Sequence, residues 1–174
     1  MEGHVEVLIS KEKVESRIKE LAKEIEKDYA TKNLVCVGLL KGSVVFMADL
    51  IKSLDIDLRI DFMKVSSYGG GTNSTGVVKI LKDVDLDLTG KDILIVEDII
   101  DTGLTIVNVK DFLKQKNPNS IKVCTLLDKP SRRLVEVKGE YVGFEIPDEF
   151  VVGYGLDLDE KYRNIPFVGK FVKE

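Results

Sequence analysis

The chain has 174 residues, of which 44% are hydrophobic and 32% are charged, with a mean hydropathy of +0.00 and a formal net charge of −4. This composition excludes a disordered chain, which would be poorer in apolar residues, and a membrane protein, which would be richer. The length is that of one ordinary domain, so we expect a single domain over residues 1–174, located in the cytoplasm and without a membrane or nucleic-acid partner.

The N-terminal part of the chain predicts two helices and three strands. A helix is expected over residues 10–30, because Ser10 can cap its start and apolar side chains recur on one face. His4, the only histidine, precedes this first predicted element. An apolar run at 34–40 predicts a strand covered on both faces, followed by a turn and a second helix. A strand near 57–66 then leads to a glycine-rich stretch, and the chain returns as a strand at 77–81.

The two cysteines, Cys36 and Cys124, each lie inside an apolar run that is typical of a strand. A zinc site or a redox pair would need closer or clustered spacing. We therefore expect two buried, reduced thiols that pack as small apolar side chains.

The strongest functional signal follows a strand predicted at 92–96. Three carboxylates, Glu97, Asp98 and Asp101, occur within five residues. They oppose one another electrostatically unless a cation or hydroxyl donors neutralise them. A helix to about Lys116 follows, and the small and hydroxyl residues at 102–105 offer free backbone N–H groups to a phosphate. A solvated acidic turn is the alternative, but this combination suits a sugar phosphate better.

Further strands are predicted at 121–127, 141–146 and 150–152, so strands and helices alternate along the chain. This alternation predicts an α/β domain with a mainly parallel central sheet. Ligands bind such sheets beyond the carboxyl ends of the strands. Five charged residues follow strand ends, and we therefore expect them to converge on one edge of the sheet: Lys41, Glu97, Asp98, Asp101 and Lys129.

Residues 96–103, with the sequence VEDIIDTG, closely resemble the phosphoribosyl pyrophosphate signature of the purine phosphoribosyltransferases. Within this family the chain resembles the bacterial hypoxanthine phosphoribosyltransferases, and the resemblance extends over about residues 5–172. It includes the family's pyrophosphate loop, lid, base-contacting lysine segment and C-terminal substrate hood, which match residues 40–42, 67–68, 126–129 and 142–163. It implies a type I phosphoribosyltransferase fold with helices flanking the sheet. A small hood from about residues 1–10 and 128–174 and a mobile lid at 67–76 are implied as well.

The resemblance also assigns roles around the sugar phosphate. Glu97 and Asp98 would lie at the ribose hydroxyls and at magnesium, and Asp101 would act as general base or acid at N7 of the purine. The 5′-phosphate would be wrapped by Asp101, Thr102, Gly103, Leu104 and Thr105. Some relatives carry lysine where this chain has Leu104, so the phosphate cradle would depend more on backbone amides and on the two threonines.

The remaining implied roles concern pyrophosphate, the base and the lid. Pyrophosphate would be bound by Lys41, Gly42 and Arg163, with a cis peptide bond between Leu40 and Lys41. Lys129 would donate to the 6-oxo group, Phe150 would stack on the base, and Val151 would contact its edge through the backbone. Asp157, in the same base-binding segment, would hold a second magnesium through water. Ser67 and Tyr68 would belong to the lid.

The implied activity is magnesium-dependent transfer of 5-phosphoribosyl from phosphoribosyl pyrophosphate to hypoxanthine and guanine, by a homodimer or homotetramer. No histidine is needed, because Asp101 can accept the N7 proton. An enzyme for another base, such as xanthine or a pyrimidine, stays an alternative. A regulator that senses phosphoribosyl pyrophosphate and binds nucleic acid is disfavoured, because residues 1–30 carry six Lys/Arg against eight Asp/Glu and so offer no basic face.

Overall fold

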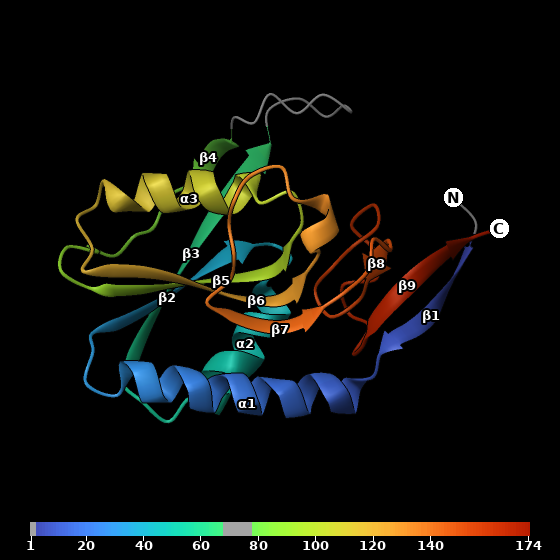
Figure 1. The fold of residues 1–174 in the computed structure, drawn as a ribbon, viewed down its shortest axis with the longest axis horizontal. Helices are drawn as coiled ribbons and strands as arrows, with labels where there is room; N and C mark the ends of the chain where they lie inside the picture. Colours follow the sequence, from blue (N-terminus) through green and yellow to red (C-terminus); the bar gives the residue numbers. More distant parts are fainter. Residues whose placement is uncertain (1–2, 68–77) are drawn as a thin grey trace.

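The computed structural model describes residues 3–67 and 78–174, and its main feature is a six-stranded central sheet (Figure 1). The strand order is β4-β3-β2-β5-β6-β7; β4 is antiparallel to β3, and the other neighbouring strands are parallel. The predicted α/β architecture with a mainly parallel sheet is therefore confirmed. The strands are β2 (Leu34–Leu40), β3 (Leu58–Ser67), β4 (Val78–Lys82), β5 (Asp92–Ile100), β6 (Ser120–Asp128) and β7 (Tyr141–Glu145).

Helices cover both faces of this sheet. Helices α1 (Lys11–Tyr29) and α2 (Val44–Ser53) lie on one face and α3 (Leu104–Lys114) lies on the other, as Figure 1 shows. Each face has its own buried apolar cluster, which stabilises the layered arrangement. The start of α1 is capped as expected, because the Ser10 hydroxyl accepts a hydrogen bond from the Lys13 N–H at 3.3 Å. None of the helices in residues 3–67 and 78–174 is long and apolar enough to cross a membrane.

The cysteine prediction is confirmed. Cys36 and Cys124 are both buried and both free. Burial raises the pKa of the Cys36 thiol to about 12, so it stays protonated at neutral pH and acts as a core side chain.

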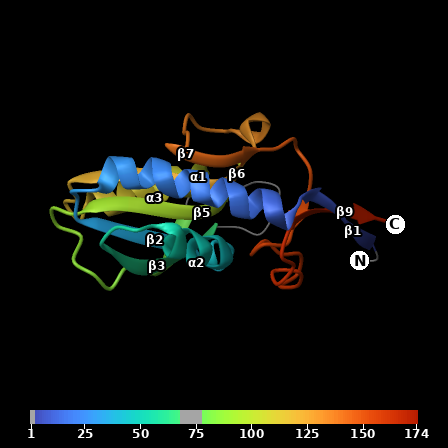
Figure 2. The same cartoon turned by 90° about the horizontal axis from the view of Figure 1, so that it is seen from below.

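A second, antiparallel sheet lies at one end of the molecule, where the two chain ends meet (Figure 2). Its order is β1-β9-β8, with β1 (Gly3–Ile9), β8 (Val151–Val152) and β9 (Val168–Lys173). Strands β1 and β9 were not predicted, and His4 lies within β1 rather than ahead of the first element. The substrate hood implied by the resemblance would draw on this sheet, whereas β7, inside the range 128–174, belongs to the central sheet.

The parallel strands bring the predicted site segments to one edge of the central sheet. Ile100 is paired with Asp128, and Asp128 with Glu145, so β5, β6 and β7 end side by side. Strand β5 continues to Ile100, beyond the predicted end at residue 96, because Glu97 and Ile99 keep their pairing with β6. The acidic pair at 97–98 is thus part of a strand and not of the following turn.

Candidate active site

The predicted pyrophosphate loop follows β2, and a hood loop packs against it. The peptide bond between Leu40 and Lys41 is cis, as the resemblance implied. A Cβ atom on Gly42 would overlap the carboxylate of Asp98, and one on Gly155 would overlap the carbonyl oxygen of Gly42. These close approaches require glycine at both positions. They join the pyrophosphate loop to β5 on one side and to the hood on the other.

The acidic pair of β5 lies in a poorly solvated position. Burial raises the pKa of both Glu97 and Asp98, and the neighbouring Asp98 carboxylate raises that of Glu97 further. The positive charge of Arg163 acts in the opposite direction and lowers the pKa of Asp98. Two adjacent carboxylates in such a position favour a proton, a cation or hydroxyl donors as partners.

The donor set at this pair fits magnesium, which binds carboxylate oxygens. No group of three or more carboxylate, histidine or cysteine side chains that could hold a metal occurs among the residues that the structure describes. A magnesium ion here would therefore need oxygens from substrate and water in addition to Glu97 and Asp98, which is the usual arrangement for this ion.

The segment after β6 packs against the predicted phosphate loop, residues 101–105. Gly103 has a φ of +86°, precedes α3, and has the side chains of Val135 and Val137 against its Cα. The Thr102 carbonyl accepts a hydrogen bond from the Leu134 N–H at 2.9 Å. The loop therefore has a fixed course into α3, whose first residues are Leu104 and Thr105 and whose first N–H groups have no partner within the helix.

The charged side chain of Arg133 also holds the phosphate loop in place. Its guanidinium donates to the carbonyl oxygens of Ile100 and Asp101, at 3.0 and 2.7 Å, and pairs with the Asp128 carboxylate. Three elements that end at the site, β5, β6 and the phosphate loop, are thus held by one side chain. Arg133 was not among the predicted site residues.

Charged groups of alternating sign connect Asp101 with Lys129. The Asp101 Oδ1 accepts from the Arg132 Nε at 3.1 Å, and the Arg132 guanidinium lies 3.5 Å from Asp148, which in turn lies 3.8 Å from the Lys129 Nζ. Lys129 is only 7% exposed, so it is not a solvated strand-end lysine. The structure therefore brings the predicted acid–base residue and the predicted base-reading lysine into one network. Arg132 and Asp148 were not predicted, since no sequence spacing marks them.

Phe150 and Val151 lie at the start of β8. Phe150 is 53% exposed, although its ring also meets the edge of Phe171 at a centroid distance of 6.5 Å. An exposed aromatic ring is available to stack on a ligand, whereas a core aromatic would not be. Val151 is buried and pairs with Lys170 of β9.

Arg163 and Asp157 lie in the hood loop between β8 and β9. The Arg163 Nη2 lies 2.9 Å from the Asp157 Oδ1, and its Nη1 donates to the Gly155 carbonyl at 2.7 Å. Glu160, which was not predicted, lies 2.8 Å from the Lys41 Nζ and 3.4 Å from Arg163. The predicted residues of the pyrophosphate loop, the acidic pair and the hood are therefore brought together.

Of the two predicted lid residues, Ser67 lies in the described part of the chain and Tyr68 does not. Ser67 is the last residue of β3, at the same edge of the sheet as the other site segments. Tyr68 and the rest of the predicted lid lie outside the described residues.

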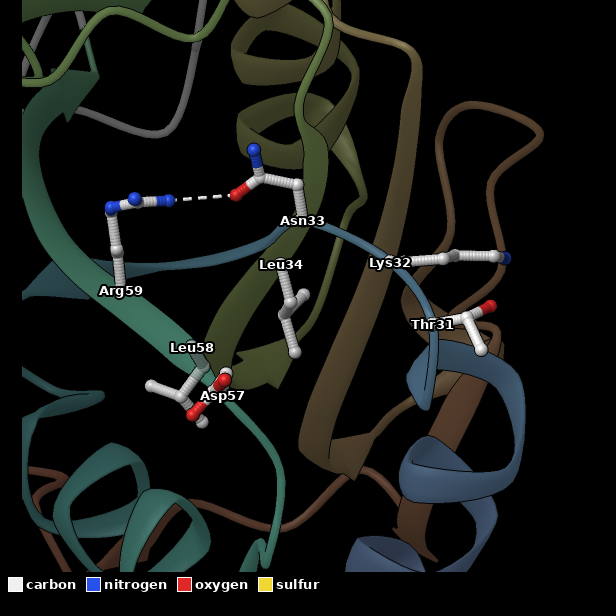
Figure 3. A pocket seen from close by; sticks show the side chains of 7 residues that line it. All are labelled: Thr31, Lys32, Asn33, Leu34, Asp57, Leu58 and Arg59. Carbon is white, nitrogen blue, oxygen red and sulfur yellow. Dashed lines mark hydrogen bonds between the residues drawn. The ribbon is translucent and has the colours of Figure 1, made fainter.

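A cavity of about 530 Å³ lies at the opposite edge of the sheet, at the amino ends of β2 and β3. Figure 3 shows Arg59 reaching across it to donate to the side chain of Asn33, at 2.7 Å. None of the predicted site residues that the structure describes lines this cavity. Because ligands bind parallel sheets beyond the carboxyl ends of their strands, the candidate active site is assigned to the other edge.

Comparisons with known proteins show which family the chain resembles. A model of the phosphoribosyl transferase domain family matches residues 4–159. A hypoxanthine-guanine phosphoribosyltransferase of Staphylococcus aureus is 53% identical over 169 residues, which are 97% of this chain and 94% of that protein, and one of Streptococcus thermophilus is 51% identical over 168 residues, 97% of this chain and 93% of that protein.

Solved structures are equally similar. The crystal structure of a hypoxanthine-guanine phosphoribosyltransferase from Bacillus anthracis has a TM-score of 0.94 and 52% identity, covering 98% of this chain and 100% of that one. The crystal structure of a hypoxanthine phosphoribosyltransferase from Staphylococcus aureus has a TM-score of 0.93 and 53% identity, covering 96% and 91%. The type I phosphoribosyltransferase fold that the sequence predicted is thereby confirmed.

Proposed function

We propose, from the premise that the chain belongs to the phosphoribosyl transferase family, that it transfers 5-phosphoribosyl from phosphoribosyl pyrophosphate to hypoxanthine and guanine. The products are IMP or GMP and pyrophosphate, so the reaction salvages purine bases. One observation carries the assignment of the site. The acidic pair of β5, the start of α3 and the buried Lys129 all lie at the carboxyl edge of one parallel sheet.

The acidic pair would act on the sugar. Loss of pyrophosphate from the anomeric carbon leaves positive charge on the ribose in the transition state and negative charge on the leaving group. The carboxylates of Glu97 and Asp98 would accept hydrogen bonds from the ribose hydroxyls and favour the positive charge. Magnesium, for which these oxygens are suitable ligands, supplies positive charge to the departing pyrophosphate when it is bound.

Cationic side chains would bind the leaving group. Lys41 and Arg163 come from the pyrophosphate loop and the hood, and both meet the same carboxylate, that of Glu160. Placed there, the two cations would favour the negative charge that develops on pyrophosphate more than the charge of the bound substrate. Asp157, which pairs with Arg163, would hold a second magnesium ion through water.

The 5′-phosphate and the base would lie on either side of Asp101. Backbone N–H groups at the start of α3 would bind the phosphate, favoured by the positive end of the helix dipole. The Asp101 carboxylate would take the proton from N7 of the purine, Lys129 would donate to its 6-oxo group, and the exposed ring of Phe150 would stack on it. This arrangement selects 6-oxopurines and needs no histidine.

The test is to offer the purified protein phosphoribosyl pyrophosphate, magnesium and, in separate reactions, hypoxanthine, guanine, xanthine, adenine and uracil, and to identify the products. We expect IMP and GMP, formation that stops when the metal is chelated, and little product from adenine or uracil. Product from uracil or adenine alone would overturn the assignment of the base. We further expect a homodimer or homotetramer, which sedimentation equilibrium would establish.

A further inference from the structure

One carboxylate joins the two cations that the proposed function assigns to pyrophosphate. The Glu160 Oε2 lies 2.8 Å from the Lys41 Nζ, and its Oε1 lies 3.4 Å from the Arg163 Nη2. Each oxygen of the carboxylate therefore faces a different cation, as two oxygens of a phosphoryl group would. Lys41 follows β2 and Arg163 lies in the hood loop, so Glu160 connects the pyrophosphate loop with the hood.

The hood loop holds Glu160 in this position by its backbone. The Glu160 N–H donates to the Asp157 Oδ2 at 2.9 Å, and Leu158 and Lys161 exchange backbone hydrogen bonds at 3.2 and 3.1 Å. Glu160 itself has a φ of +61°. A left-handed conformation is unfavourable for a glutamate and persists where the surrounding structure fixes it, which is common at functional sites. Figure 1 shows this loop between the central sheet and the strands β1 and β9.

The contacts with Glu160 do not use every hydrogen-bond donor of the two cations. The Nε–H group of Arg163 is buried and has no hydrogen-bond partner among the described residues. A buried donor without a partner is unfavourable, and a ligand with more acceptor oxygens than one carboxylate would correct this. Pyrophosphate has the charge and the oxygens to do so.

The side chain of Glu160 can leave without disturbing the fold. It is 63% exposed, so moving fully into solvent would cost mainly its two ion pairs. Exposed ion pairs contribute little stability, because both partners are well solvated when apart. The Lys41–Glu160 contact is therefore weak enough for a polyanion to replace.

We propose that Glu160 is a competing anion at the pyrophosphate site: in the empty enzyme it pairs with Lys41 and Arg163 in the place of the leaving group, and it is displaced when pyrophosphate binds. This inference rests on the proposed function. It predicts competition, because the carboxylate and the ligand cannot occupy the two cations together. Glu160 would thus weaken the binding of pyrophosphate and promote its release after transfer.

The test is the affinity of the wild-type protein and of Glu160→Gln for inorganic pyrophosphate in the presence of magnesium, measured by isothermal titration calorimetry at low salt. Glutamine keeps the size of the side chain and removes its charge. We expect the variant to bind pyrophosphate roughly 3- to 30-fold more tightly, as the loss of two competing exposed ion pairs would allow. The difference should shrink in 1 M salt, where such pairs are screened. Product inhibition by pyrophosphate should increase by a similar factor.

Glu20→Gln is the matched control. Glu20 also pairs at 2.8 Å, with Arg17, and is 61% exposed, but it lies on α1 away from the site. This variant should bind pyrophosphate as the wild type does. Unchanged or weaker binding by Glu160→Gln, with normal binding by the wild type, would overturn the inference alone. A wild-type protein that does not bind pyrophosphate with magnesium would overturn both the inference and the proposed function.

Discussion

The Cα atom of Gly42 lies directly against the carboxylate of Asp98, and a methyl group on residue 42 would overlap the Oδ2 atom. The two residues come from the ends of neighbouring strands, β2 and β5. Their contact sets the distance between the proposed pyrophosphate loop and the proposed ribose site. The sugar and its leaving group are adjacent in the substrate, so this spacing should matter for the reaction more than for the fold.

Gly42→Ala should therefore lower kcat/KM for phosphoribosyl pyrophosphate by about 10²-fold, since a displacement of about 1 Å in an active site can cost that factor. Steady-state kinetics with hypoxanthine as acceptor would measure this. Gly139→Ala is the control, because its Cβ would meet its nearest atom at 3.2 Å and lies outside the site. Equal kcat/KM values for the two variants would contradict the prediction.

Asp101→Asn should reduce kcat by about 10²-fold or more, because asparagine cannot accept the N7 proton. The amide oxygen can still accept the hydrogen bond that Arg132 now donates to Asp101 at 3.1 Å, so binding of IMP should remain near the wild-type value. Turnover and IMP affinity would be measured side by side. Asp111→Asn, which removes an exposed partner of Lys114 on α3, serves as control. Normal turnover by Asp101→Asn would remove this residue from the acid–base role.

Lys129→Ala should weaken the preference for 6-oxopurines over 6-aminopurines. Loss of a hydrogen bond that involves a charged group costs about 1.5–3 kcal/mol, which corresponds to roughly a 10- to 100-fold fall in the ratio of kcat/KM for hypoxanthine to that for adenine. Competition assays with both bases would give this ratio directly. Lys114→Ala, an exposed lysine on α3, should leave it unchanged. A wild-type ratio in Lys129→Ala would place recognition of the 6-oxo group elsewhere.

The acidic pair predicts how stability depends on pH. Burial, reinforced by Asp98, raises the pKa of Glu97 well above its ordinary value of 4.5. We consider the pH range between 4.5, the ordinary pKa of Glu97, and its raised pKa in the folded chain. In this range the folded chain binds a proton that the unfolded chain has released, so the free energy of unfolding falls as pH rises. The stabilising contribution is complete below pH 4.5 and decreases as pH rises through the raised pKa of Glu97 in the folded chain.

Glu97→Gln removes this ionisation. At pH 7.5 we expect its Tm to exceed that of the wild type by about 2–4 °C, the shift that roughly 1 kcal/mol produces in a chain of this length, and at pH 4 the two should coincide. Thermal unfolding monitored by circular dichroism at both pH values would show this. Glu136→Gln, an exposed site, should match the wild type at each pH. A Glu97→Gln variant that is less stable than the wild type at pH 7.5 would contradict the prediction. It would mean that neighbouring groups in the fold already stabilise the charged Glu97 carboxylate.

The sequence predicted the central sheet and the segments of the site because both are local patterns. Continuous apolar runs mark β2, β5 and β6, and the strand ends carry the motifs. Strand β1 was missed since it has no such run. It alternates exposed and partly buried side chains, and Val7 is 60% exposed. Within residues 3–67 and 78–174 its one strand partner is β9, far along the sequence. The ion-pair partners of the site residues, such as Arg132 and Glu160, were missed for a related reason. Ion pairs between segments that are distant in sequence produce no regular residue spacing from which they could be predicted.

The pairing of β1 with β9 also has a consequence for the order of folding. Strand β1 is an edge of the small sheet, and its partner β9 lies far along the sequence, with Gly3 opposite Lys173. Because contacts so distant in sequence form slowly, the central sheet and its helices should assemble before the small sheet is complete. The newly made protein should therefore reach a compact state before it becomes competent to catalyse, and loss of the final strand should abolish catalysis while leaving the larger sheet folded.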